Sequence, residues 1–263
     1  MSQAKLKVAF IGAGNMATAI AQGMHASGQY QILVTDPFAA AVSRWKANFS
    51  ATDYQPSDVV DAIVLAVKPQ QFGAVASVSQ QIPASTLLIS VMAGVSCAKI
   101  SSLMGGHAAI VRTMPNTPAR IQQGITALFA TQACSEAHKA LSNAMMSSIG
   151  QTVWLNDERL INAVTAVSGS GPAYVFYIAQ ALASEGEALG LPANIARQLS
   201  LATLQGAAAL AQQTGEDLNT LREQVTSKGG TTAAALGVFK FAHLDETIQA
   251  AVRAAHSRAV ELA

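Results

Sequence analysis

Charged side chains are scarce in this sequence. Only 12% of its 263 residues are Asp, Glu, Lys or Arg, about half the usual share of roughly 25%. So few charged residues would cover the surfaces of two isolated domains poorly. We therefore expect a large apolar surface to be buried between subunits. The net charge is +1 and no run of Lys or Arg occurs, which argues against a nucleic-acid partner.

Long apolar runs, clustered cysteines and metal-ligand patterns are also missing. The richest apolar stretch, Leu87–Ala98, is interrupted by serines and a glycine and is shorter than the ~18 residues of a membrane span. Cys97 and Cys134 stand apart, with no Cys/His cluster at metal-ligand spacing, so we expect no metal. We interpret both as buried side chains in a reducing cytoplasm, and we expect a cytoplasmic protein without a signal peptide.

The segment Val8–Ile20 reads VAFIGAGNMATAI and combines an apolar run, a glycine-rich turn and the start of a helix. The run before Gly12 suits a buried parallel strand. Gly12 permits a tight turn, Gly14 lets the backbone approach a phosphate, and Ala17 allows close packing of helix on sheet. Because free N–H groups at a helix start attract anions, the segment predicts a dinucleotide pyrophosphate site. The residues assigned to it are Ile11, Gly12, Ala13, Gly14, Asn15 and Met16.

A second apolar run, Ile32–Thr35, ends at Asp36, where an acidic residue would hold ribose hydroxyls. This carboxylate favours NADH, because it would repel the 2′-phosphate of NADPH. Arg44 and Lys46 on the following helix can soften the repulsion, although a solvated helix face is our first interpretation of both. We therefore expect NAD or NADP to bind, with NADH tolerated unusually well.

Apolar runs alternate with helical patterns from Lys5 to about Leu155, which predicts an α/β domain with a Rossmann-type, doubly wound parallel sheet. The expected strands are Lys7–Ile11, Gln31–Thr35, Ala62–Val67, Thr86–Val91 and Ala109–Thr113, with Ile125–Ala130 and Thr152–Leu155 added at the sheet edge. The expected helices are Asn15–Ser27, Phe38–Asn48, Gln70–Gln80 and Ser135–Ile149.

After Asn156 helical patterns rich in Ala, Leu and Gln take over. A long helix is expected from Pro172, a favoured first helical residue, to near Gly190. Further helices are expected at about Ala193–Gln213, Leu218–Val225, Thr232–Phe239 and Glu246–Leu262. We therefore divide the chain into a dinucleotide-binding domain, residues 1–156, and an all-α dimerisation and substrate domain, residues 157–263.

Ligands of an open α/β sheet bind outside the carboxyl ends of its strands, and three further segments reach that edge. Pro69 breaks a strand, prolines fix the loop around Asn116, and small residues around Ala93 admit a flat ring. Lys68 is equally well interpreted as a phosphate contact or as a solvated lysine. The cofactor-binding residues assigned here are Ala66, Val67, Lys68, Pro69, Ala93 and Asn116.

The segment Val225–Thr232 places hydroxyl residues on both sides of two glycines and leads into a helix. A helix N-terminus surrounded by hydroxyls predicts an anion site, which we call the anion cradle. A helix cap alone would need one such hydroxyl. The substrate-binding residues assigned to the anion cradle are Ser227, Gly229, Gly230, Thr231 and Thr232.

Over nearly its whole length the chain resembles the Δ1-pyrroline-5-carboxylate reductases. The segments that carry the resemblance are Ile11–Met16, Ala66–Pro69, Met114–Ala119, Ser168–Tyr174 and Val225–Thr232. The resemblance implies reduction of 1-pyrroline-5-carboxylate to L-proline by NAD(P)H, the last step of proline biosynthesis, commonly with NADPH. It also implies an active site between two domains, completed in a homodimer and often within a decamer, a pentamer of dimers. Lys228 departs from the family's usual proline.

Thr232 is our candidate catalytic residue, because its hydroxyl can hydrogen-bond the ring nitrogen of a cyclic imine; none of the five histidines falls in a motif. Two alternatives stay open. A β-hydroxyacid dehydrogenase would resemble this plan, but such enzymes carry a lysine on the first long helix of the second domain, and Pro172–Leu189 has none. A nucleotide-sensing regulator without activity is the other.

Overall fold

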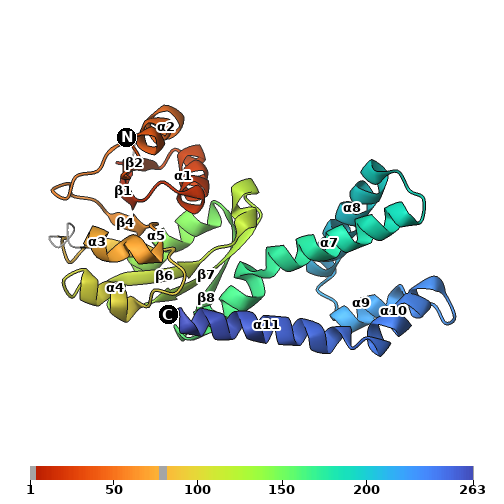
Figure 1. The fold of residues 1–263 in the computed structure, drawn as a ribbon. Helices are drawn as coiled ribbons and strands as arrows, with labels where there is room; N and C mark the ends of the chain where they lie inside the picture. The colour runs from red at the N-terminus through yellow and green to blue at the C-terminus, as the bar shows by residue number, and fades with distance from the viewer. Residues whose placement is uncertain (1–3, 77–81, 263) are drawn as a thin grey trace. The chain divides into compact units, whose positions relative to one another are not determined.

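The computed structural model of this chain describes residues 4–76 and 82–262. In the described chain, β-strands join into one sheet in the order β3-β2-β1-β4-β5-β6-β7-β8 (Figure 1). The strands are β1 (Leu6–Ile11), β2 (Tyr30–Thr35), β3 (Thr52–Asp53), β4 (Ala62–Leu65), β5 (Leu87–Ser90), β6 (Ile110–Met114), β7 (Gly124–Ala130) and β8 (Gly150–Leu155). All neighbours are parallel except β6 and β7. The first six strands therefore have the order of a dinucleotide-binding sheet.

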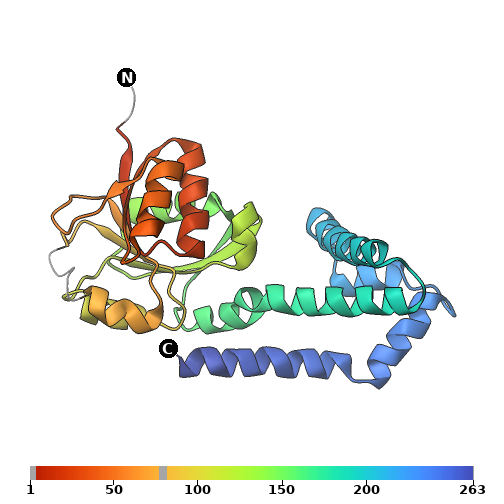
Figure 2. The ribbon, with the colours of Figure 1, turned by 45° about the horizontal axis from the view of Figure 1, so that its top comes forward.

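Helices cover both faces of this sheet. They are α1 (Asn15–Ser27), α2 (Ala39–Phe49), η1 (Pro69–Gln71), α3 (Phe72–Ala76), α4 (Cys97–Leu103), η2 (Thr117–Ile121) and α5 (Glu136–Ser147). One buried cluster joins the sheet to α1, α2 and α5, and a second joins its other face to α3 and α4. Figure 2 shows α1 and α2 (red to orange) on one side of the sheet and α3 on the other.

The alternation of side chains along β1 explains how the sheet joins both clusters. Phe10 belongs to the cluster under α1 and α2, where its ring centroid lies 5.0 Å from that of Trp45. Its neighbour Ile11 points to the opposite cluster with Phe72. Because successive strand residues point to opposite faces, an uninterrupted apolar run such as that of β1 is buried on both sides.

Two compact units divide the chain: Met1–Ser170 with Ala255–Ala263, and Gly171–Ala254. The boundary differs from the one expected after Asn156, because α6 (Leu160–Val164) still packs against β6 and β7. A π-helical turn, η3 (Thr165–Gly169), then leads to the second unit.

The described residues of the second unit form helices joined by loops: α7 (Gly171–Ala188), α8 (Ala193–Thr214), α9 (Leu218–Gln224), α10 (Thr231–Phe241) and the larger part of α11 (Leu244–Glu261). The hydroxyl of Ser200 on α8 donates to the carbonyl of Ala179 on α7 over 2.7 Å. Large apolar side chains remain exposed, among them Tyr177 at 78% and Phe241 at 89%. Across residues 4–76 and 82–262, no helix is both long and apolar enough to cross a membrane.

The expected fold class, a Rossmann-type sheet followed by an all-α part, is confirmed. Five elements were not expected: the two-residue strand β3, the seven-residue helix α4, and the five-residue elements η2, α6 and η3. Each is too short to display a hydrophobic period. The helix expected at Gln70–Gln80 is present as η1 and α3 as far as Ala76, and its last part lies outside the described residues. α7 begins at Gly171, one position before the proline expected to start it.

Candidate active site

The glycine-rich turn between β1 and α1 has a backbone that a side chain would disturb. Gly12 has a φ of 101°, and its N–H donates to the carbonyl of Thr35 over 2.9 Å. A Cβ atom on Gly12 would lie 2.6 Å from the carbonyl oxygen of Ala66. Within the described chain, α1 begins at Asn15 after Gly14 without a side-chain cap. Its first amides are therefore available to an anion.

Asp36 follows β2, and its carboxylate accepts two backbone hydrogen bonds. The N–H of Ala13 donates over 2.8 Å and that of Phe38 over 2.9 Å. A carboxylate has room for about four such bonds, so acceptor positions remain for ribose hydroxyls. Because Ala13 already donates to Asp36, a bound pyrophosphate depends on the amides that follow it.

A cavity of about 1090 Å³, which we call the dinucleotide pocket, lies along the carboxyl ends of β1, β2 and β4. The predicted cofactor residues that line it are Ile11, Gly12, Ala13, Gly14, Asp36, Ala66, Val67 and Lys68. Its volume slightly exceeds the range for small-molecule pockets, roughly 300–1,000 Å³. The strand order reverses between β1 and β4, which is where such sheets bind dinucleotides. The residues present therefore fit NAD or NADP.

Three other predicted cofactor residues are neighbours of this lining. Asn15 and Met16 form the first turn of α1, directly after Gly14. Pro69 is the first residue of η1 and follows Lys68. None of the three lines the dinucleotide pocket among the residues described, and their contact with a cofactor stays a prediction.

Ala93 and Asn116 also lie outside the lining of the dinucleotide pocket. The side chain of Asn116 already has two partners: Nδ2 donates to the carbonyl of Ser168 over 3.2 Å, and Oδ1 accepts from the N–H of Ile125 over 3.0 Å. This asparagine therefore ties the loop after β6 to β7 and η3. Ala93 lies in the turn after β5, beside Gly94, whose φ is 70°. Cofactor contacts of Ala93 and Asn116 stay predictions.

Several lining residues were not assigned from the sequence. Phe38 and Arg44 come from the β2–α2 segment, and Tyr54 and Gln55 follow β3. Burial, together with the nearby Asp58, raises the pKa of the Tyr54 hydroxyl, so it stays protonated. The helical spacing of Arg44 from the buried Trp45 and Phe49 would have shown which face of α2 it occupies. The short β3 carries no comparable signal.

The anion cradle lies at the start of α10. Gly230 precedes Thr231, the first helical residue, and no side chain caps α10 among the described residues. The N–H of Gly230 donates to the carbonyl of Ser227 over 3.0 Å. A Cβ atom on Gly230 would clash with the hydroxyl of Ser227, and Gly229 has a φ of 73°. The backbone thus requires a glycine at position 229, whereas at position 230 the Ser227 side chain could rotate away. The helix start is left open, with Thr232 half-buried.

A buried ion pair joins β6 to the start of α6. Nη1 of Arg112 donates to Oε1 of Glu158 over 2.9 Å, and the same oxygen accepts from the N–H of Cys97 over 2.8 Å. The Arg112 side chain is only 4% exposed, and its Nε has no partner among the described residues. Burial, and then the Glu158 carboxylate, raise the pKa of the Cys97 thiol to about 12. This cluster holds the sheet and α4 to α6 and presents no reactive thiolate.

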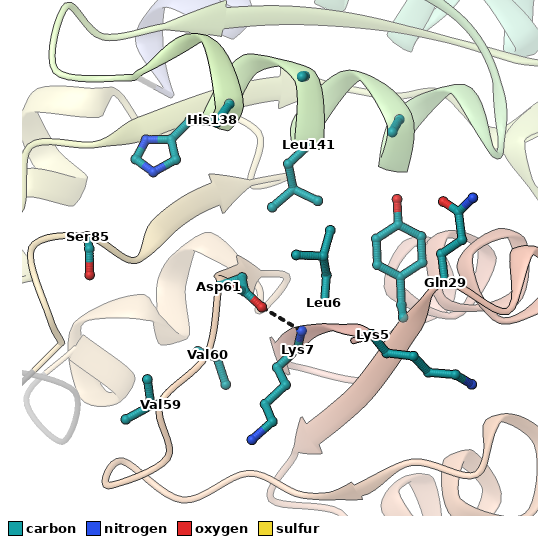
Figure 3. A pocket seen from close by; sticks show the side chains of 14 residues that line it. Lys5, Leu6, Lys7, Gln29, Val59, Val60, Asp61, Ser85, His138 and Leu141 are labelled. Atoms are coloured by element: carbon teal, nitrogen blue, oxygen red, sulfur yellow. Dashed lines mark hydrogen bonds between the residues drawn. The ribbon is translucent and has the colours of Figure 1, made fainter. Parts of the chain in front are cut away.

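A second cavity, of about 830 Å³, lies at the amino ends of β1 and β4 (Figure 3). Its carboxylate, Asp61, already accepts the backbone N–H of Lys7 over 2.7 Å. The side chains of Lys5 and Lys7 lead away from each other, and His138 lies on the far side. These polar groups do not converge on one point, so this cavity lacks the arrangement of a ligand site. In the parts of the chain that the structure describes, no three His, Cys, Asp or Glu residues could hold a metal ion.

Two family models match the chain, one in each half. A family described as pyrroline-5-carboxylate reductase dimerisation matches residues 158–262. A family described as coenzyme F420-dependent NADP oxidoreductase matches residues 7–94, the segment that contains much of the dinucleotide pocket.

Relatives of nearly equal length are also similar. A pyrroline-5-carboxylate reductase of Pseudomonas aeruginosa is 39% identical, covering 98% of this chain and 97% of the relative. One of Haemophilus influenzae is 40% identical, covering 97% of both. A solved reductase of the same name from Coxiella burnetii has a TM-score of 0.90 at 36% identity over 99% of both chains. The Plasmodium falciparum pyrroline carboxylate reductase, solved with NADP bound, has a TM-score of 0.86 at 26% identity over 98% of both.

Proposed function

The chain belongs to the pyrroline-5-carboxylate reductase family, and we propose that it reduces 1-pyrroline-5-carboxylate to L-proline with NAD(P)H, the final step of proline biosynthesis. The observation that carries the proposal is the near full-length similarity to reductases of this name. The starts of α1 and α10, each preceded by a glycine and without a side-chain cap, support it, because the reaction needs one anion site for the cofactor and one for the substrate.

The dinucleotide pocket holds the cofactor in this proposal. The pyrophosphate lies at the start of α1, where Gly14, Asn15 and Met16 supply backbone amides, and Asp36 faces the adenine ribose. Gly14 and Asp36 line the dinucleotide pocket, which supports these two placements. The nicotinamide ring supplies hydride when the cofactor is bound. Ala93, Asn116 and Pro69 are proposed contacts farther along the same strand edge.

The anion cradle holds the substrate carboxylate. Backbone amides at the start of α10 and the hydroxyls of Ser227 and Thr231 are the proposed donors. Charge-assisted hydrogen bonds of this kind are worth roughly 1.5–3 kcal/mol each, whereas an exposed helix dipole gives only roughly 0.3–1 kcal/mol. Direct contacts therefore dominate substrate affinity. Lys228 is exposed and adds a positive charge beside these donors.

Thr232 is the proposed catalytic residue. Its hydroxyl hydrogen-bonds the ring nitrogen of the imine and orients the neighbouring carbon for hydride attack, which is chiefly a matter of position. The nitrogen gains a proton on reduction, and water is the proposed source of that proton. Thr232 is the second residue of α10 and is half-buried, which limits the directions open to its side chain.

The active form is proposed to be a homodimer, with a pentamer of dimers as the larger assembly. The match of residues 158–262 to a dimerisation family and the exposed apolar side chains of α7 to α11 support an oligomer. Hydrophobic surface of this extent is buried in obligate assemblies. We also propose that the enzyme acts in the cytoplasm, which agrees with two free cysteines.

The test is an assay of the purified full chain with 1-pyrroline-5-carboxylate and either NADH or NADPH. We expect loss of the reduced-nicotinamide absorbance and an equal amount of L-proline formed. β-Hydroxy acids with NAD⁺ or NADP⁺ serve as the comparison substrates and should give no turnover. Binding of dinucleotide without turnover of the imine would instead support a nucleotide-sensing regulator.

A further inference from the structure

Helix α2 carries two cations whose surroundings differ. Nζ of Lys46 pairs with the carboxylate of Asp53 over 2.7 Å, and Lys46 does not line the dinucleotide pocket. Arg44, two positions earlier, does line it and makes no ion pair within residues 4–76 and 82–262. One cation of the helix is therefore engaged elsewhere, and the other is available to a ligand in the pocket.

The face of α2 that reaches the pocket is defined by helical spacing. Ala40, Ala41 and Arg44 line the dinucleotide pocket together, and residues three and four apart lie on one side of a helix. Trp45 and Phe49 point into the core, which fixes the rotation of α2. The two alanines leave space between the backbone of α2 and the pocket, and the long side chain of Arg44 can extend across it.

Asp36 and Arg44 both line the dinucleotide pocket, at the end of β2 and on the helix that follows. Both carboxylate oxygens of Asp36 already accept backbone N–H groups, from Ala13 and Phe38. The carboxylate is thus held by the backbone, whereas the Arg44 guanidinium, which lines the same pocket, makes no ion pair among the described residues. This is the part of the pocket where the adenine ribose of a dinucleotide lies.

We propose that Arg44 binds the 2′-phosphate of NADPH and allows the pocket to accept NADPH despite the carboxylate of Asp36. The inference rests on the proposed function and deepens it, because it names the residue that distinguishes NADPH from NADH in the same site. A guanidinium presents a planar fork of donors that matches a phosphate. NADH has a hydroxyl at this position, so its binding gains nothing comparable from Arg44.

Equilibrium binding of NADPH and NADH to the full chain tests this, with nicotinamide fluorescence as the readout and no substrate present. In Arg44→Gln we expect the Kd for NADPH to rise at least tenfold, equivalent to about 1.4 kcal/mol, and the Kd for NADH to change less than twofold. Lys46→Gln is the matched control on the same helix and should leave both constants unchanged. Arg44→Lys should recover part of the NADPH affinity, because it keeps the charge and loses the fork.

Two results would overturn the proposal. One is an unchanged ratio of NADPH to NADH affinity in Arg44→Gln, whether both constants stay the same or both rise together. The other is an equal loss of NADPH affinity in Lys46→Gln, which would indicate a general effect of charge. Unchanged NADH binding in Arg44→Gln also shows that the variant is folded. Because the readout is binding, a wild-type chain that binds both dinucleotides but reduces no imine would refute the proposed function and leave the Arg44 comparison valid.

Discussion

The carboxylate of Asp36 lies 2.8 Å from the backbone nitrogen of Ala13, so the end of β2 is tied to the glycine-rich turn that follows β1. The parallel register of Ile11 with Thr35 brings these two loops together. A second bond, from the N–H of Phe38, holds the carboxylate from the other side. Asp36 therefore has a positioning role in the turn besides the contact with ribose that its place after β2 predicts.

Replacing Asp36 by serine is expected to shift cofactor preference toward NADPH. A carboxylate about 4 Å from a 2′-phosphate costs roughly 1 kcal/mol in water and roughly 4 kcal/mol at an effective dielectric of 20. This range corresponds to about fivefold to about a thousandfold in the ratio of kcat/KM values. Because the bond to Ala13 is weakened as well, affinity for both cofactors should fall somewhat.

The measurement is kcat/KM with NADH and with NADPH, and Asp53→Ser, outside the pocket, is the control. We expect the wild type to use both cofactors. An NADH/NADPH ratio that Asp36→Ser leaves unchanged would mean that the carboxylate does not face the ribose.

Gly12 and Gly14 should respond differently to replacement by alanine. At Gly12 the φ of 101° and the 2.6 Å approach to the Ala66 carbonyl oxygen make a methyl group costly, and we expect a lower melting temperature. At Gly14 no atom lies within 4 Å of an added Cβ and φ is −71°. Gly14→Ala should therefore melt like the wild type and yet bind NAD(P)H at least tenfold more weakly. Wild-type cofactor affinity in Gly14→Ala would remove the turn from the site.

Periodicity and spacing predicted the parts of the site that are local in sequence. The apolar run before Gly12 and the run that ends at Asp36 were enough to place both at one strand edge, because parallel strands are aligned in register. Asn116 shows the limit. Its place in a loop fixed by prolines suggested a ligand contact, which stays a prediction, but did not indicate that its side chain bonds Ser168 and Ile125. Such pairings join segments far apart in the chain, and no local pattern encodes them.

Arg44 and Lys46 illustrate the same limit on a smaller scale. From the sequence, both are interpreted as cations of a solvated helix face. Only the packing of α2 shows that Arg44 lines the pocket and that Lys46 pairs with Asp53. Asp53, which pairs with Lys46, belongs to the two-residue strand β3, too short for any periodic signal. The sequence gives the positions of the charged residues along the chain. Which of them line the pocket depends on the tertiary structure.

Cys97 should be nearly inert toward thiol reagents at pH 8. Burial and the Glu158 carboxylate raise its pKa to about 12, so roughly one thiol in ten thousand is ionised at that pH. The test is the rate of labelling of Cys134→Ala, in which Cys97 is the remaining cysteine, in the native state and in denaturant. Labelling of the native protein at the denatured rate would contradict the raised pKa.

The same pKa predicts a dependence of stability on pH. An unfolded thiol has its ordinary pKa of about 9.0, whereas burial raises the pKa of the folded thiol to about 12. The unfolded state therefore binds fewer protons between these values, and the contribution of Cys97 is present below pH 9 and is lost as pH rises toward 12. Compared with Cys97→Ala, which cannot titrate, the free energy of unfolding of the wild type should fall more steeply above pH 9.

Assembly is expected to depend on the residues after Asn156. A chain that ends there loses the exposed apolar helices and also the partners of Arg112 and Asn116, namely Glu158 and Ser168. We expect it to bind dinucleotide weakly at best and to have no reductase activity. A chain ending at Ser170 keeps both partners, lacks Ala255–Ala263 of the first unit as the shorter chain does, and is the control for the loss of Glu158 and Ser168. By sedimentation the full chain should be a dimer or larger, and a stable, active monomer would contradict the proposed assembly.

Thr232 and Ser227 should separate catalysis from binding. Thr232→Ala removes the hydroxyl placed on the imine nitrogen, so kcat should fall; a lost bond of roughly 1.5–3 kcal/mol corresponds to about tenfold or more. Ser227→Ala removes a hydroxyl placed on the carboxylate or its loop, so KM for the imine should rise while kcat stays close to the wild type. Thr226→Ala is the matched control, because that hydroxyl already donates to the carbonyl of Arg222 over 2.6 Å. Steady-state kinetics at saturating NADPH decide the outcome: wild-type constants in both Thr232→Ala and Ser227→Ala would exclude the anion cradle as the substrate site.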